Sequence, residues 1–249
     1  MQERQIPIKQ NDAVRRTDID GQADRNRKGI RILLFLLGCV LILWIGVYIL
    51  REKRYAFISL GLTVLACWFL ISGFDRRRTH VRRLVLIAVM TALSVLGRFL
   101  FAALPGFKPM TAIIVLTGMY LGYEAGFMCG ACTAVLSNFY FGQGPWTPFQ
   151  MFAFGMLGLL AGLLHRGLKK SRVLLIIYGI FAGIAYSLMM DVWSVLWAYD
   201  GFSISAYLAA LVTALPYTVS YALSNVVFLL LMKKPFGSKL NRMIVKYGI

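Results

Sequence analysis

Long apolar runs occupy most of the chain, and short polar segments separate them. The first two runs cover residues 30–50 and 55–74, with a charged turn at residues 51–54 between them. An α-helix needs about 20 apolar residues to cross the hydrocarbon core of a bilayer. We therefore expect residues 30–75 to form a transmembrane hairpin of two helices.

Six further apolar runs follow a dense basic segment. They cover residues 84–104, 109–121, 125–140, 148–165, 173–197 and 206–232. Lipid offers no hydrogen-bond partner to a backbone N–H or C=O group, so each run is expected to satisfy its own backbone as an α-helix. The pattern predicts an all-α integral membrane protein in which an extra two-helix transmembrane hairpin precedes a bundle of six helices.

The polar segments complete the expected organisation of the chain. Residues 1–29 carry charges of both signs and contain no apolar run, so they fit a flexible tail and not a cleavable signal peptide. We expect a cytosolic polar tail at 1–29, the hairpin at 30–75 and a basic cytosolic linker at 76–83. A six-helix membrane domain then covers 84–249 and ends in a short basic tail.

Composition supports a membrane protein and removes a competing interpretation of the charge. Hydrophobic residues make up 59% of the chain and charged residues 15%, with a mean hydropathy of +0.71. The net charge of +17 would favour nucleic acid as the partner of a soluble protein. Here most basic residues lie in segments on one side of the membrane. Because basic flanks stay in the cytosol, both termini are predicted to be cytosolic, with the lipid bilayer and no nucleic acid as partner.

Two short motifs have plain structural interpretations. Glycines recur at four-residue spacing, as in Gly118, Gly122 and Gly126, which favours close helix packing within the bundle over a dimer interface. Cys129 and Cys132 match the C-x-x-C spacing of redox proteins. They lie in an apolar helix, whereas a reactive thiolate needs a polar and exposed site, so we interpret them as packing residues.

Motifs for catalysis or cofactor binding do not occur in the sequence. It has no paired set of metal ligands, no nucleophile elbow and no complete phosphate-binding loop. We expect no metal, no cofactor and no catalytic residue, and we do not expect an enzyme. Hydrolysis of ATP would have to come from another protein.

Two charged residues lie well within the predicted spans. Arg98 and Asp191 fall at comparable depth in the outer halves of their helices. A charge inside the bilayer is costly, and it usually pairs with another charge or lines a cavity. Two interpretations stay open and are compatible: a salt bridge between the two residues, or contact with a ligand.

Aromatic and amide side chains cluster in the outer loops beside these charges. A mostly apolar pocket with a few placed polar groups is how proteins bind small organic ligands, although aromatic residues at this depth also form the interfacial belt. We expect the ligand to arrive from outside the cell. The candidate substrate-binding residues are Arg98, Phe107, Lys108, Asn138, Tyr140, Gln143, Trp146, Thr147, Gln150, Asp191, Trp193 and Trp197.

Residues 84–232 resemble the substrate-binding (S) components of energy-coupling factor (ECF) vitamin transporters. The resemblance rests on the six helices, on Ala88 and Ala92 in an A-x-x-x-A pattern, and on Gly-Gln-Gly-Pro-Trp-Thr-Pro at residues 142–148. That run is the more specific feature and is similar to one branch of S components, assigned to cobalamin or related corrinoids. Riboflavin, a thiamine precursor and a queuosine precursor stay open, because an aromatic cavity suits any planar ring compound.

The resemblance implies a substrate-specific subunit of a micronutrient importer in the bacterial cell membrane. Such a subunit has no ATPase of its own and needs a transmembrane T subunit and two cytosolic ATPase subunits. It would dock on the T subunit through the face that carries Ala88 and Ala92, then topple to release its ligand inside. The hairpin lies outside this pattern and would either hinder toppling or serve as an anchor. An integral-membrane enzyme and a structural or sensory membrane protein remain the alternatives.

Overall fold

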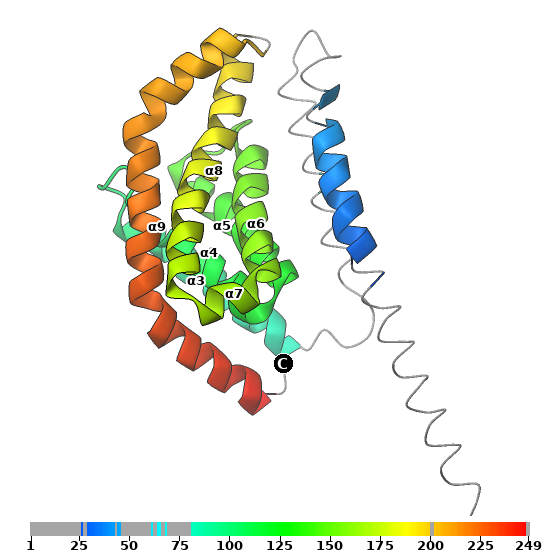
Figure 1. The fold of residues 1–249 in the computed structure, drawn as a ribbon, viewed down its shortest axis with the longest axis vertical. Helices are drawn as coiled ribbons and strands as arrows, with labels where there is room; N and C mark the ends of the chain where they lie inside the picture. The colour runs from blue at the N-terminus through cyan, green and yellow to red at the C-terminus, as the bar shows by residue number, and fades with distance from the viewer. Residues whose placement is uncertain are drawn as a thin grey trace, which may run out of the picture.

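The computed structural model describes residues 81–199 and 202–247, residues 29–42, and isolated positions at 26, 44–45, 61, 64–65 and 68. These residues form helices and connecting turns without a strand, which confirms the predicted all-α membrane bundle. A helix at Gly29–Ile42 comes first. The labelled helices are α3 (Val81–Leu100), α4 (Met110–Leu121), α5 (Tyr123–Phe141), α6 (Thr147–Leu163), α7 (His165–Lys170), α8 (Arg172–Ala198) and α9 (Ile204–Tyr247) (Figure 1).

The helices match the predicted spans in place and differ from them at their ends. α3 ends at Leu100, before the predicted end at residue 104, because the backbone then turns toward Pro105. α9 does not end at the predicted residue 232. It continues to Tyr247, with Pro216 and Pro235 inside the helix.

The extension of α9 has a clear physical cause. Phe236, Leu240 and Ile244 recur every four residues, which places them on one face of the helix. Leu240 is buried in the main hydrophobic core, and the other two pack against that core. The apolar face therefore continues beyond the predicted membrane span, although the opposite face is polar and basic.

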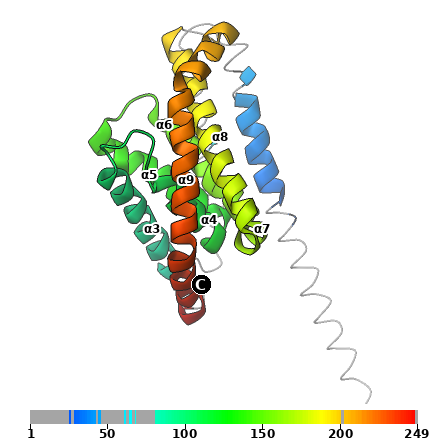
Figure 2. The same ribbon diagram turned by 60° about the vertical axis from the view of Figure 1, so that its left-hand side comes forward.

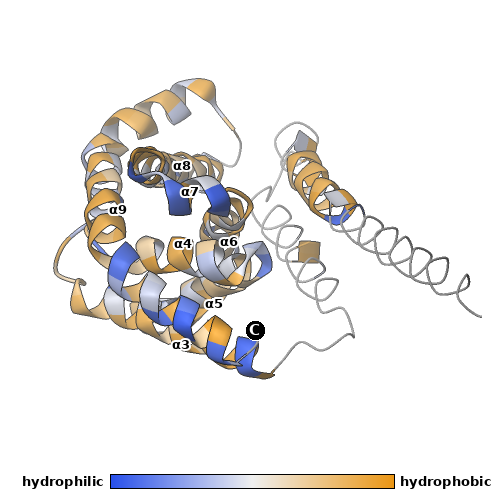
Figure 3. Ribbon diagram, turned by 60° about the horizontal axis from the view of Figure 1, so that its bottom comes forward, coloured by the Kyte–Doolittle hydropathy of each residue, from blue (hydrophilic) through white to orange (hydrophobic). Residues whose placement is uncertain are grey.

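Helix length separates the periphery of the bundle from its centre. Among the described residues, three helices, α3, α8 and α9, are long and apolar enough to cross a membrane. α4 has only 12 residues, about 18 Å of helix, but nearly all of its side chains are buried. Figure 3 shows α4 between α3 and α5 on one side and α8 and α9 on the other. A short helix is tolerated here because its neighbours, and not lipid, surround it.

Close contact of the inner helices depends on glycine. A Cβ atom on Gly126 of α5 would overlap the backbone of Gly158 in α6, and the reverse also holds. Gly118 of α4 meets the same stretch of α6. Gly118 and Gly126 thus serve packing within the bundle, as predicted, although they lie in different helices. Gly122 does not share this role: it forms the junction between α4 and α5 with a φ of 98°, a left-handed conformation that favours glycine. Cys129 is buried in the same interior, as expected of a packing residue, whereas Cys132 is exposed.

The N-terminal helix packs against α5 and α6. Phe35 is completely buried, and its ring meets Phe127 edge-on with the centroids 5.4 Å apart. Arg31 forms an ion pair with Glu124, whose second carboxylate oxygen lies 3.9 Å from Arg83 of α3. The first half of the predicted hairpin therefore contacts the bundle. Most of its second half, residues 55–74, lies outside the described residues.

Candidate functional site

The candidate residues gather toward one end of the bundle. This end, here called the loop end, holds the connections at residues 101–109 and 142–146 and the turn that follows α8 (Figure 2). The short helix α7 and the C-terminal part of α9 lie at the opposite end (Figures 1 and 2). Residues far apart in the sequence are thereby brought into one region.

A buried amide links three helices at the loop end. Arg98, in the last turn of α3, donates from Nη1 to Ser137 Oγ and, over 2.8 Å, to Asn138 Oδ1. Asn138 is only 1% exposed, and its Nδ2 donates to Thr147 Oγ1 at 3.0 Å and to Gln150 Oε1 at 2.8 Å. A buried polar group is stable when its hydrogen bonds are satisfied. Asn138 meets this condition, because both the oxygen and the nitrogen of its side-chain amide are hydrogen-bonded.

The run at residues 142–148 forms a tight connection onto α6. Gly142 has a φ of 104°, a left-handed conformation that favours glycine. The Thr147 hydroxyl donates to Gln143 Oε1 at 3.0 Å, and Gln143 Nε2 donates to the carbonyl of Val135 at 2.9 Å. Gln143 is exposed, so its side chain fixes the loop and joins the buried network at its outer edge, through Thr147.

An aromatic surface continues from the polar network toward α8 and α9. Gln150 Nε2 donates to the Tyr186 hydroxyl at 3.5 Å. The Tyr186 ring stacks on Phe154 at 4.4 Å between centroids and meets Tyr221 edge-on at 5.2 Å. These three rings were not predicted as site residues, because they lie within apolar runs, away from the loops. The available signal was the hydroxyl of a tyrosine inside such a run, which needs a polar partner when it is buried.

Arg98 and Asp191 do not form the salt bridge that was one of the two interpretations. Within residues 81–199 and 202–247, Arg98 contacts Ser137 and Asn138 on the α5 side of the site. Asp191 instead accepts a hydrogen bond from Ser187 at 3.5 Å, and Ser187 shares another with Thr218 of α9 at 2.6 Å. The two charges therefore belong to different sides of the site.

Lys108 approaches the same aromatic ring as Arg98. The Cζ of Arg98 lies 4.6 Å from the centroid of Phe141, and the Nζ of Lys108 lies 5.8 Å from it. Burial, and then the charge of Arg98, lower the pKa of Lys108. Tyr140 also contacts this region through Phe99, but its side chain is 74% exposed.

The predicted tryptophans form a separate cluster. Trp146 meets Trp193 edge-on at 5.9 Å, and Trp193 stacks on Trp197 at 5.8 Å. Trp193 is buried in the hydrophobic cluster that also contains Phe35 of the N-terminal helix. Phe107 packs in another direction, 5.2 Å from the ring of Phe228 in α9. The polar network and the tryptophans are thus distinct groups at the loop end.

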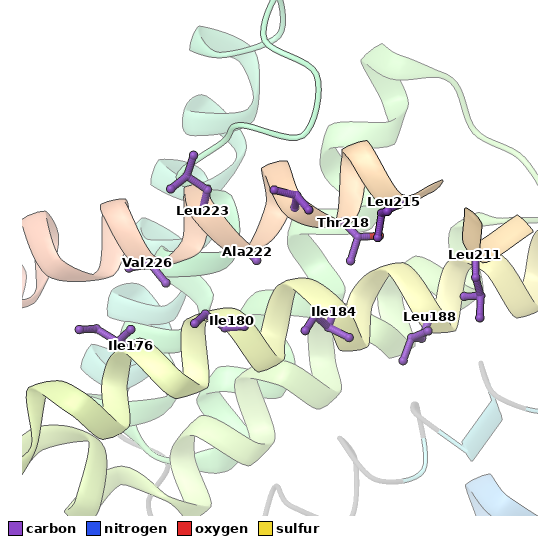
Figure 4. Close-up of a pocket in the computed structure, with 11 residues that line it drawn as sticks. Ile176, Ile180, Ile184, Leu188, Leu211, Leu215, Thr218, Ala222, Leu223 and Val226 are labelled. Carbon is purple, nitrogen blue, oxygen red and sulfur yellow. The ribbon is translucent and has the colours of Figure 1, made fainter. Parts of the chain in front are cut away.

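A surface groove of about 640 Å³ lies between α8 and α9 (Figure 4). Apart from the hydroxyl of Thr218, its lining is aliphatic, so it lacks the polar groups that orient a vitamin ring. None of the candidate residues lines it. Its lining residues are Ile176, Ile180, Ile184, Leu188, Leu211, Leu215, Thr218, Val219, Ala222, Leu223 and Val226.

The fold is that of a helical membrane protein, and one end of its bundle contains a buried polar network beside a group of aromatic rings. A family model described as "ECF-type riboflavin transporter, S component" matches residues 78–241. This match covers well over half of the chain, so the chain belongs to that family, which is a family of transporter components and not of enzymes. No curated protein and no solved structure matches the chain.

Proposed function

We propose that this S component binds a planar ring vitamin at its loop end, with riboflavin as the first candidate. The hydrogen bond between Gln150 and Tyr186 is the observation that carries the proposal, because it joins the amide network to the aromatic surface. The isoalloxazine ring of a flavin has a flat apolar face and an edge of donors and acceptors. Stacked rings beside amides are the matching surface. The family description, which names riboflavin, supports the same choice.

Cobalamin is the second candidate, and the run at residues 142–148 is the feature that favours it. The family description does not name cobalamin. The hydrogen bonds of Gln143 and Thr147 give the run a structural role in shaping the loop. A loop of this shape is compatible with either vitamin, so the ligand has to be identified by binding.

The proposed partners are a transmembrane T subunit and two cytosolic ATPase subunits. Ala88 and Ala92 are exposed on α3, which packs on α4 and α5 with its other side. Small residues four positions apart allow another helix to approach closely within a membrane. This face of α3 is therefore the proposed docking surface.

The proposed orientation places the loop end outside the cell. The opposite end carries Lys169, Lys170 and Arg172 around α7, together with the basic residues in the last part of α9. Basic segments stay in the cytosol, so this end is assigned to the cytosolic side. A nutrient from outside would then meet the polar network first.

A thermal-shift panel tests the substrate. The full chain in detergent, without ATP, is heated with riboflavin, cobalamin, thiamine or a queuosine precursor. A ligand at 100 times its Kd stabilises the folded state by about 2.7 kcal/mol, which shows as a rise in Tm. We expect riboflavin to give such a rise and Gln150→Leu to reduce it. If no ring vitamin raises Tm, the substrate proposal is wrong.

Tyr178→Phe is the matched control for a loss of buried polar contacts. The Tyr178 hydroxyl donates to the carbonyl of Leu157, away from the proposed site. This variant should lower Tm with and without ligand and leave the ligand-induced rise intact. If Tyr178→Phe and Gln150→Leu reduce the ligand-induced rise in Tm equally, Gln150 affects binding only by stabilising the fold.

A further inference from the structure

Two cations at the loop end, Arg98 and Lys108, share one aromatic ring. Neither of them forms an ion pair with a carboxylate within residues 81–199 and 202–247. Arg98 and Lys108 both approach the ring of Phe141. The ion pairs found among the described side chains instead involve Glu124, which lies at the start of α5. Charges within or beside a membrane bundle usually pair or line a cavity.

Arg98 has hydrogen-bonding capacity to spare. Its bonds to Ser137 and Asn138 both come from Nη1. Its other N–H groups, on Nη2 and Nε, make no hydrogen bond within the described part of the chain. A guanidinium group has a planar fork of donors that fits a carboxylate or a phosphate with two parallel hydrogen bonds. The Nη1 group of Arg98 is thus held by its two bonds, and the Nη2 and Nε groups are available to bind an anion.

Lys108 is fixed through its backbone. The Lys108 N–H donates to Ser224 Oγ at 2.8 Å, and the Ser224 hydroxyl donates back to the Lys108 carbonyl at 2.9 Å. This pair of bonds ties the connection at residues 101–109 to α9. The Lys108 backbone is therefore fixed, and its ammonium group lies over the same ring as Arg98, although two like charges repel each other.

Cation–π contact with Phe141 is too weak to explain the arrangement alone. Such a contact is a modest attraction at an exposed site and a stronger one when the cation is desolvated. It stabilises one cation well, whereas a second cation at the same ring adds repulsion. An anion between them would be attracted to both.

We propose that Arg98 and Lys108 form an anion subsite that binds a phosphate or carboxylate group on the transported ring compound. The inference rests on the proposed function in one respect, that the ring of this compound occupies the neighbouring surface at Tyr186. It narrows the substrate class from any planar vitamin to an anionic one. Among flavins, it favours riboflavin 5′-phosphate over riboflavin.

Riboflavin and riboflavin 5′-phosphate are a matched pair of probes, because they differ only by the phosphate. The full chain is titrated with each in detergent, and quenching of flavin fluorescence gives the two Kd values. We expect the phosphate form to bind at least about tenfold more tightly, which corresponds to about 1.4 kcal/mol. In Arg98→Gln the two flavins should bind about equally, so that the ratio of their Kd values is about 1. In Lys108→Gln the ratio should lie between this value and that of the wild-type chain.

Lys169→Gln is the matched control. The Lys169 ammonium also lies over an aromatic ring, 4.6 Å from the centroid of Tyr120, but at the opposite end of the bundle. Its removal should leave the preference unchanged. Arg98→Lys keeps the charge and should retain part of the preference. If Arg98→Gln does not fold, Lys108→Gln and Arg98→Lys carry the comparison.

The outcomes separate the two proposals. Equal Kd values for the two flavins overturn the anion subsite and leave the proposed function intact. If neither flavin binds, the flavin assignment is wrong, and inorganic phosphate alone tests the subsite. The Tm of the wild-type chain should then be higher in phosphate than in sodium chloride of equal ionic strength. The Tm of Arg98→Gln should be the same in both. The same rise in both, or in neither, overturns the subsite.

Anionic lipid is a second source of the same chemistry. The titration is therefore repeated in nanodiscs of phosphatidylcholine, with and without phosphatidylglycerol. An unchanged preference assigns the subsite to the transported compound. If the preference for the phosphate form, or the rise in Tm with phosphate, disappears only when phosphatidylglycerol is present, the subsite belongs to a lipid headgroup. That result overturns the role of the subsite in substrate selection.

Discussion

At the residue scale, the amide of Asn138 connects the parts of the polar site. It accepts from Arg98 and donates to Thr147 and Gln150, so its contacts reach α3 and α6 from its own position in α5. Its burial makes each of these bonds valuable, because a buried group without a partner loses the hydrogen bonds that water would supply.

Asn138→Ala should therefore lower stability and ligand binding together. A buried donor or acceptor that loses its partner costs roughly 1–3 kcal/mol, and this substitution leaves such groups on Arg98, Thr147 and Gln150. Thermal unfolding in detergent measures the loss, with Asn241→Ala as the control at an exposed position of α9. A Tm equal to that of the control would contradict the central role of Asn138.

The sequence predicted the polar members of the site better than its walls. Arg98, Asn138 and Gln150 stand out in a membrane protein because a polar side chain within or beside an apolar run needs a reason. Tyr186 and Tyr221 did not stand out, since tyrosine is common in apolar helices. Only the packing of α6, α8 and α9 brings these rings together, and no local pattern encodes that packing.

At the element scale, the N-terminal helix is attached to the bundle through Glu124. This carboxylate lies in the first turn of α5, where the helix dipole favours a negative charge. It pairs with Arg31 of the N-terminal helix and lies close to Arg83 of α3. The helix thus covers α5 and α6 through its contacts and leaves Ala88 and Ala92 of α3 exposed.

Glu124→Gln should loosen the N-terminal helix. The substitution keeps the shape of the side chain and removes the charge that pairs with Arg31. Hydrogen exchange of backbone amides at residues 29–42 should become faster, while exchange within α4 stays slow. Exchange that is unchanged at 29–42 would show that apolar contacts such as Phe35–Phe127 hold the helix without the ion pair.

Ala88→Leu combined with Ala92→Leu should block docking on a T subunit. Bulky side chains at both positions prevent the close approach of a second helix. Co-purification with co-expressed T and ATPase subunits should be lost, while the ligand-induced rise in Tm persists. Ala209→Leu, at an exposed position of α9, serves as the control. If the double variant still co-purifies, docking uses another face.

Element positions could be predicted from the sequence because the bilayer sets a length for apolar runs. The ends could not, since they depend on tertiary contacts. α9 extends to Tyr247 because Phe236, Leu240 and Ile244 find the core, and a hydropathy pattern alone does not show that partner. α7 likewise forms in a segment for which no helix was predicted, where Leu168 is buried against the core.

At the scale of the whole molecule, the proposed function separates ligand binding from energy supply. Its family is a transporter component, and its sequence has no complete phosphate-binding loop for ATP. The proposed site lies at one end of the bundle and the basic surface at the other. In the proposed cycle, the chain captures its ligand alone and needs the T and ATPase subunits only for release into the cell.

Uptake of radiolabelled riboflavin into proteoliposomes tests this account most directly. The chain is reconstituted alone or with its T and ATPase subunits, with ATP supplied on the side of the ATPases. We expect saturable binding by the chain alone at one ligand per chain, and ATP-dependent accumulation only in the full assembly. Accumulation by the chain alone, or no binding of riboflavin or any other ring vitamin in either preparation, would contradict it.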